Sequence, residues 1–250
     1  MKRILTFILT LSLALSFCVN SFAAATTATA SETQTGTSEA QTDTSKTQAD
    51  TSEAQTDTSK VQAGASYGIS NLSGAPDIVA ESAVVMDANT GTILYGKEAD
   101  TKRYPASITK VMTALLAVEN CKMSDVITYS NAAVNGIGAG SSTAGINVGA
   151  KLTVEDSLYA LMLVSANEAA AAIAEHISGS TTEFAKLMTK RAKELGCKNT
   201  QFKNPHGLPD EEHYTTAYDM GLILKEAMKH PEFRKIAGTI SYTLKKSDSL

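Results

Sequence analysis

The sequence predicts an α+β domain whose strands and helices occupy separate parts of the chain. Two apolar, β-branched segments, 82–87 and 92–95, lie on either side of an Asn/Gly turn, as in a β-hairpin. A series of segments with helical spacing follows, and a single strand-like segment, 240–244, comes last. Strands and helices that do not alternate are typical of α+β folds. We therefore expect an antiparallel sheet with a helical subdomain.

The N-terminal part is not expected to belong to this domain. Residues 1–25 combine a positively charged start, an apolar run and small-x-small cleavage sites, which is the pattern of a signal peptide. Residues 26–66 are rich in Thr, Ser, Ala and Gln, and the decapeptide 37–46 recurs unchanged at 51–60. Such a composition buries too little apolar surface to fold, so it predicts a disordered linker. We expect an exported protein whose folded domain is 67–250.

Composition excludes several classes of function. The formal net charge is −4 and no basic stretch is present, so no nucleic acid partner is expected. The four histidines form no H-E-x-x-H pattern and no cluster with cysteine, so no metal is expected. Once the signal peptide is removed, only Cys121 and Cys197 remain. They can pair or remain buried thiols, and we expect thiols.

The helices are predicted from apolar spacing and from the residues that begin and end them. Pro105 begins a helix that runs to about residue 120, and its apolar positions give it a buried face. Thr153, Ser180 and Thr216 are candidate N-caps of later helices. These later helices are expected at 153–164, 168–176, 183–195 and 217–229, and the Gly/Ser-rich segment 135–150 is expected to be a loop.

Two short motifs carry the chemistry. Ser107 and Lys110 lie three residues apart at a helix start, where their side chains are neighbours. A lysine whose pKa is lowered by burial can accept the serine proton, which makes a nucleophile without histidine. Ser165 and Asn167 form a Ser-x-Asn motif at a helix junction. Alone this motif is typical of a helix cap, but the two motifs together in an exported protein favour an active site.

These motifs and their flanking segments resemble the low-molecular-mass penicillin-binding proteins, the D-alanyl-D-alanine carboxypeptidases of the β-lactamase-like serine peptidases. The resemblance covers about residues 78–250. It implies a β-lactamase/transpeptidase-like fold and a serine-type carboxypeptidase that needs no cofactor. The matching segments are 86–91, 94–95, 105–114, 165–170, 204–208 and 213–219.

The resemblance also implies a role for each motif residue. Ser107 is expected to be the nucleophile, with its backbone N–H in the oxyanion hole, and Lys110 its proton acceptor. Ser165 is expected to relay the proton to the leaving D-alanine nitrogen. Asn167 is expected to hold Lys110 and the substrate backbone by hydrogen bonds. The implied partners are peptidoglycan stem peptides ending in D-Ala-D-Ala, and β-lactams, at the extracytoplasmic face of the membrane or in the cell wall.

The sequence departs from the family pattern at two places. Ala166 stands where carboxypeptidases often have Gly and β-lactamases have Asp. No Lys-Thr-Gly motif is present, and Lys-Ser-Asp at 246–248 does not replace it. We therefore expect a catalytic domain that stops before its final strands. Any peripheral membrane association is expected only through a C-terminal region that this chain does not contain.

The departures leave two alternatives open. The first is an inactive, exported peptidoglycan-binding remnant, which the missing third motif favours. The second is another enzyme with the same nucleophile, a DD-endopeptidase or a β-lactamase. Penicillin labelling separates the remnant from the enzymes. Digestion of a cross-linked dimer and turnover of a chromogenic β-lactam separate the enzymes from one another.

Overall fold

The computed structural model describes residues 78–138 and 140–244. The signal peptide and the linker expected at 1–66 lie outside the described residues, as does the segment 246–248. The described part is α+β, as predicted. In chain order its elements are β1 (Ala83–Met86), β2 (Ile93–Lys97), the 3-10 turn η1 (Ala106–Thr109), α1 (Lys110–Asn120), β3 (Val126–Thr128), α2 (Asn131–Asn135), β4 (Lys151–Thr153), α3 (Val154–Leu163), α4 (Asn167–Ser178), α5 (Thr181–Glu194), α6 (Ala217–Ala227) and α7 (Pro231–Ala237).

The predicted hairpin is confirmed, because β1 and β2 pair antiparallel, with Val85 opposite Tyr95. The Asp87 carboxylate holds the turn by accepting hydrogen bonds from the backbone N–H groups of Asn89 and Thr90. Gly91 completes the turn with a φ of +80°, a conformation that favours glycine. A second antiparallel pair, β3 with β4, was not expected from the sequence.

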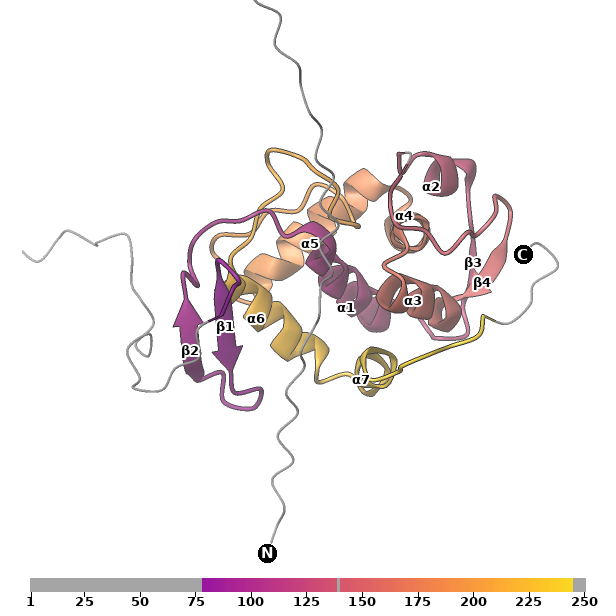
Figure 1. Cartoon of the computed structure of the whole chain (residues 1–250). Helices are drawn as coiled ribbons and strands as arrows, with labels where there is room; N and C mark the ends of the chain where they lie inside the picture. The colour runs from indigo at the N-terminus through magenta and orange to yellow at the C-terminus, as the bar shows by residue number, and fades with distance from the viewer. Residues whose placement is uncertain (1–77, 139, 245–250) are drawn as a thin grey trace, which may run out of the picture. The chain divides into compact units, whose positions relative to one another are not determined.

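Helix α1 is central to the packing of the described helices. It contacts α3, α4, α5, α6 and α7, and Figure 1 shows it between α6 on one side and α3 and α4 on the other. Met112, Leu115 and Leu116 are almost completely buried, which confirms the predicted buried helix. Its start differs from the expectation, because residues 106–109 form a 3-10 turn and the α-helix begins at Lys110.

Side-chain caps fix where three of the helices begin. Thr153, Ser180 and Thr216 each accept a hydrogen bond from the backbone N–H three residues ahead, as predicted. Gly179 adopts the left-handed conformation just after α4 and ends it. Local sequence signals therefore placed these helices within a few residues of their observed bounds.

The C-terminal end differs from the expectation in two ways. Helix α6 ends before Pro231, as predicted, but Pro231 is also the first residue of α7, a helix that was not expected, at a position where the missing N–H of proline costs nothing. The strand expected at 240–244 is not formed. Instead Tyr242 stacks on Tyr159 with ring centroids 3.7 Å apart and donates a hydrogen bond of 2.7 Å to Asp156. This segment packs on α3 and pairs with none of the strands that the structure describes.

The two cysteines among the described residues carry free thiols. Cys121 is a half-buried free thiol and Cys197 a buried one, as expected. Among residues 78–138 and 140–244, no helix combines the length and the apolarity needed to cross a membrane.

Candidate active site

Ser107 and Lys110 meet where η1 passes into α1. Lys110 Nζ lies 3.4 Å from Ser107 Oγ. The Ser107 side chain is exposed, whereas Lys110 is only 3% exposed. A solvent-accessible hydroxyl therefore stands next to a buried amine, as the spacing of the motif predicts.

Burial changes the acid–base behaviour of Lys110. It lowers the pKa of Lys110 to about 8, while the negative charge of Glu168 acts in the opposite direction. Lys110 Nζ also donates a hydrogen bond of 2.9 Å to the carbonyl oxygen of His206. When Lys110 is neutral, one N–H remains on this carbonyl and the nitrogen lone pair is available to the Ser107 hydroxyl.

The turn 204–208 holds Lys110 from a distant part of the sequence. The Asn204 side chain accepts a hydrogen bond of 2.7 Å from the Gly207 N–H and donates one of 2.9 Å to the Leu208 carbonyl. The Pro205 carbonyl accepts a 2.6 Å hydrogen bond from the Thr113 hydroxyl. The sequence resemblance included this segment, but it did not assign it a task. The segment fixes the carbonyl to which Lys110 is bound.

The same turn also supports the residue before Ser107. Ala106 has a φ of +48°, which is unfavourable for a residue with a side chain. Gly207 packs so closely on the Ala106 carbonyl that a Cβ atom at position 207 would clash with it. Such strain persists only where the surroundings enforce it. The close contact with Gly207 is one such constraint.

Two histidines near the site are neutral at physiological pH. Burial is the main cause that lowers the pKa of His206 and of His213 to about 4. His213 Nδ1 accepts a hydrogen bond from the Lys203 N–H, so its proton is on Nε2. That nitrogen lies 2.9 Å from the buried hydroxyl of Thr109, to which it donates. His213 therefore anchors η1 rather than serving as a base for Ser107.

The second motif lies on the turn between α3 and α4. Ser165 has a φ of +58°, and Asn167 is the first residue of α4. Ser165 Oγ and Asn167 Oδ1 are buried and have no hydrogen-bond partner. The expected hydrogen bond from Lys110 to Asn167 Oδ1 is therefore not formed; the Lys110 amine bonds to the His206 carbonyl and the Ser107 hydroxyl. Since α1 packs against both α3 and α4, the two motifs belong to adjoining elements.

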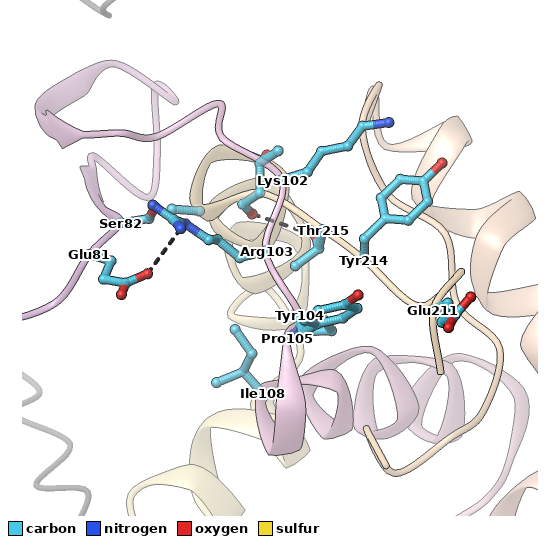
Figure 2. A pocket seen from close by; sticks show the side chains of 12 residues that line it. Glu81, Ser82, Lys102, Arg103, Tyr104, Pro105, Ile108, Glu211, Tyr214 and Thr215 are labelled. Carbon is cyan, nitrogen blue, oxygen red and sulfur yellow. Dashed lines mark hydrogen bonds and ion pairs between the residues drawn. The ribbon is translucent and has the colours of Figure 1, made fainter. Parts of the chain in front are cut away.

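A groove of about 690 Å³ opens beside η1. Figure 2 shows Tyr104 and Ile108 at the start of the helix, with the 2.9 Å ion pair between Glu81 and Arg103 on one side and Tyr214 on the other. Ser107 does not line this groove, but Pro105 and Ile108, which lie on either side of it in the sequence, do. The groove therefore borders the segment that carries the exposed Ser107.

One cluster among the described residues has the composition of a metal site. Glu119, Glu226 and His230 bring their ligand atoms within 4.8 Å of one another. Arg191 already occupies this cluster, with hydrogen bonds of 2.7 and 3.0 Å to the two carboxylate oxygens of Glu119. A fixed guanidinium supplies the positive charge that the acids require, so the cluster is an ion pair between helices.

The fold is shared with solved penicillin-binding proteins. Penicillin-binding protein 5 from Haemophilus influenzae matches with a TM-score of 0.61 and 35% identity, over 65% of this chain and 49% of that one. The Streptomyces K15 DD-transpeptidase matches with a TM-score of 0.61 and 35% identity, over 64% of this chain and 65% of that one. The described residues thus have the β-lactamase/transpeptidase-like fold of the low-molecular-mass penicillin-binding proteins.

The sequence places the chain more narrowly. It matches the D-alanyl-D-alanine carboxypeptidase family, peptidase family S11, over residues 70–249. Carboxypeptidase DacF of Bacillus subtilis (strain 168) is 44% identical over 165 residues, which cover 64% of this chain and 42% of that protein. DacA of Escherichia coli (strain K12) is 36% identical over 160 residues, 61% of this chain and 40% of DacA. The chain belongs to the D-alanyl-D-alanine carboxypeptidase family, and it spans less than half the length of these two relatives.

Proposed function

We propose that the chain carries the acylation site of a serine-type D-Ala-D-Ala carboxypeptidase, which removes the terminal D-alanine from peptidoglycan stem peptides. The observation that supports this most is the Ser107–Lys110 pair, in which an exposed hydroxyl lies 3.4 Å from a buried amine. Membership of the carboxypeptidase family supplies the substrate class. β-Lactams act as substrate mimics that acylate the same serine. The reaction requires no cofactor.

Residues of both motifs, Ser107 with Lys110 and Ser165 with Asn167, take part in the acylation step. Ser107 Oγ attacks the carbonyl carbon of the penultimate D-alanine, and its proton passes to Lys110 Nζ. The Ser107 backbone N–H, near a helix start, stabilises the oxygen that becomes negative. The C–N bond then breaks, and the leaving D-alanine nitrogen takes a proton from Lys110 through Ser165. Asn167 orients the substrate backbone.

Deacylation restores the enzyme. Water attacks the ester carbonyl of the acyl-enzyme, the C–O bond to Ser107 breaks, and the shortened peptide leaves as a carboxylate. The water proton returns to Ser107 through the same residues. A β-lactam forms the same kind of ester with Ser107, but its leaving amine stays attached to the acyl group. The ester is therefore hydrolysed slowly.

The site of action is proposed from the N-terminal sequence. A signal peptide at 1–25 and a linker at 26–66 are consistent with export to the extracytoplasmic face of the membrane or the cell wall. Peptidoglycan stem peptides are found there, and D-alanyl-D-alanine carboxypeptidases of this family act on them. Nucleic acid and metal have no part in the proposed reaction.

Labelling with a fluorescent penicillin tests the proposal. We expect one covalent label on the wild-type chain and none on the Ser107→Ala variant, with Ser141→Ala, a loop serine, as a matched control that remains labelled. Release of D-alanine from a pentapeptide then distinguishes a carboxypeptidase from an endopeptidase, and turnover of a chromogenic β-lactam tests the β-lactamase alternative. Equal labelling of the wild type and Ser107→Ala would sink the proposal.

A further inference from the structure

Glu168, directly after the second motif, is a buried carboxylate that the reaction above does not use. It is 1% exposed. Its Oε1 accepts hydrogen bonds of 2.6 Å from the Thr143 hydroxyl and 2.6 Å from the Ala144 N–H. In addition, the Asn167 N–H donates a 2.9 Å hydrogen bond to the Ser142 carbonyl. The start of α4 is therefore fastened to the loop 142–146.

The hydrogen bonds alone do not explain why an acid rather than an amide stands at this position. An amide oxygen could accept the same two bonds. The second carboxylate oxygen, Oε2, is buried and has no hydrogen-bond partner. A buried charge is costly unless an opposite charge stabilises it. The structure therefore calls for a positive group that faces Glu168 during at least part of the reaction.

Lys110 is the group that meets this requirement. Helix α1, which begins with Lys110, packs directly against α4, where Glu168 lies in the first turn. The charge of Glu168 acts on Lys110 and favours its protonated form, against the effect of burial. In the proposed reaction, Lys110 is a neutral amine before Ser107 attacks, and it becomes an ammonium ion when it takes the Ser107 proton.

We propose that Glu168 is a positioning residue that stabilises the ammonium form of Lys110 through its charge, while its Oε1 holds the loop 142–146 in place. This inference rests on the function proposed above. In the step concerned, the Ser107 O–H bond breaks, an N–H bond forms on Lys110 and the Ser107 oxygen bonds to the substrate carbonyl carbon. Glu168 accepts no proton and touches no substrate.

Other titratable groups around this pair do not supply the same charge. His206 and His213 are neutral above about pH 5, because burial lowers the pKa of each to about 4. Burial raises the pKa of Tyr129, so its phenol stays neutral. The charged groups on the other elements packed against α1 and α4 have partners of their own: Asp156 on α3, Glu119 and Arg191 between α1 and α5, Asp219 on α6, and Glu155 with Lys235 between α3 and α7.

Direct titration of Lys110 tests the proposal without requiring enzymatic activity. The full chain is labelled with ¹³C at lysine Cε, and the Lys110 signal is assigned by its loss in Lys110→Arg. We expect Glu168→Gln to lower the Lys110 titration midpoint by about one pH unit, because it removes a nearby opposite charge. Thr143→Ala removes a hydrogen bond of the loop but no charge, so its midpoint should match the wild type. Glu155→Gln is the matched control for an acid-to-amide change on the adjoining helix.

A kinetic measurement tests whether the shift of the Lys110 titration midpoint also changes the pH dependence of acylation. The pH profile of penicillin acylation in Glu168→Gln should shift to lower pH by the same amount, and Glu168→Asp should restore it. An unchanged Lys110 midpoint in Glu168→Gln would overturn the inference, as would a Glu168→Gln chain that does not fold. Failure of the wild-type chain to acylate would instead count against the proposed function and leave the titration result valid.

Discussion

In the proposed reaction, Lys110 is the residue that determines over which pH range Ser107 can react. Its pKa is lowered to about 8 because it is buried. The proposed reaction needs the neutral amine, so the fraction of reactive enzyme grows as the pH rises towards and past this value.

We therefore predict that the rate of Ser107 acylation rises with pH between about 6 and 8 and levels off above about 9. Both histidines near the site titrate at about 4, so neither should add a step in this range. Stopped-flow acylation with a fluorescent penicillin measures the profile. A rate that falls from pH 7 to pH 9 would exclude Lys110 as the base.

The same burial makes Lys110 a cost to stability. In the unfolded chain its pKa is near the ordinary value of 10.5, and in the folded chain it is about 8. Between these values the unfolded state binds more protons, so the free energy of unfolding should rise as the pH increases from 8 to about 10.

We predict that the stability of Lys110→Met relative to the wild type is about 1–3 kcal/mol higher at pH 7 than at pH 10, because only the wild type then buries an amine whose pKa is lowered. The difference shrinks between these values, because the folded wild type has lost its proton above about pH 8 while the unfolded chain retains it up to about 10.5. Urea denaturation of both proteins at the two pH values measures the difference. A stability difference that is the same at pH 7 and at pH 10 would contradict the prediction.

At the scale of elements, the turn 204–208 joins parts of the chain that are far apart in sequence. Its backbone binds Lys110 and Thr113, and its glycine packs on the carbonyl of Ala106. The close contact means that Gly207 is required for space as well as for its φ of +87°.

We predict that Gly207→Ala destabilises the fold by about 2–4 kcal/mol and slows acylation, because a Cβ atom must displace the backbone before Ser107. Gly145→Ala is the matched control, since Gly145 has a φ of +73° but open space around the added atom. That variant should lose only about 1 kcal/mol. Equal losses in the two variants, measured by chemical denaturation, would show that the contact with Ala106 does not matter.

Local signals predicted some elements well and others not at all. Thr153, Ser180 and Thr216 begin helices as expected, because a cap acts on N–H groups within its own turn. The strands β3 and β4 have three residues each, which is too short for an alternating pattern to be visible. The prediction of a strand at 240–244 was wrong because a strand forms only with a partner strand elsewhere in the chain. Tyr242 instead packs on α3.

On the scale of the whole molecule, the candidate site depends on contacts between distant segments. The spacing of Ser107 and Lys110 on one helix could be read from the sequence. The bond from Lys110 to the His206 carbonyl could not, because no local pattern encodes a contact across 96 positions. Likewise, the sequence did not indicate Glu168 as a partner of Lys110, since the burial and the loop contacts of Glu168 are properties of the folded chain.

Arg191 contributes to holding these segments together, because it bonds to Glu119 on α1 and approaches Glu226 on α6 at 3.8 Å. We predict that Arg191→Lys lowers the free energy of unfolding by about 1–2 kcal/mol, because an ammonium cannot bind a carboxylate through two parallel bonds. Lys190→Ala, next to it on an exposed part of the same helix, should change stability by less than about 0.5 kcal/mol. Thermal or chemical denaturation of both variants checks the contrast, and equal effects would refute it.

The most direct measurement is the mass of the intact chain after incubation with benzylpenicillin, followed by peptide mapping. We predict a single penicilloyl adduct on the peptide that contains Ser107, no adduct in Ser107→Ala, and strongly slowed formation in Lys110→Met at pH 8. Absence of any adduct on the folded chain, or an adduct on another residue, would contradict the assignment of Ser107 and Lys110 as an acylation pair.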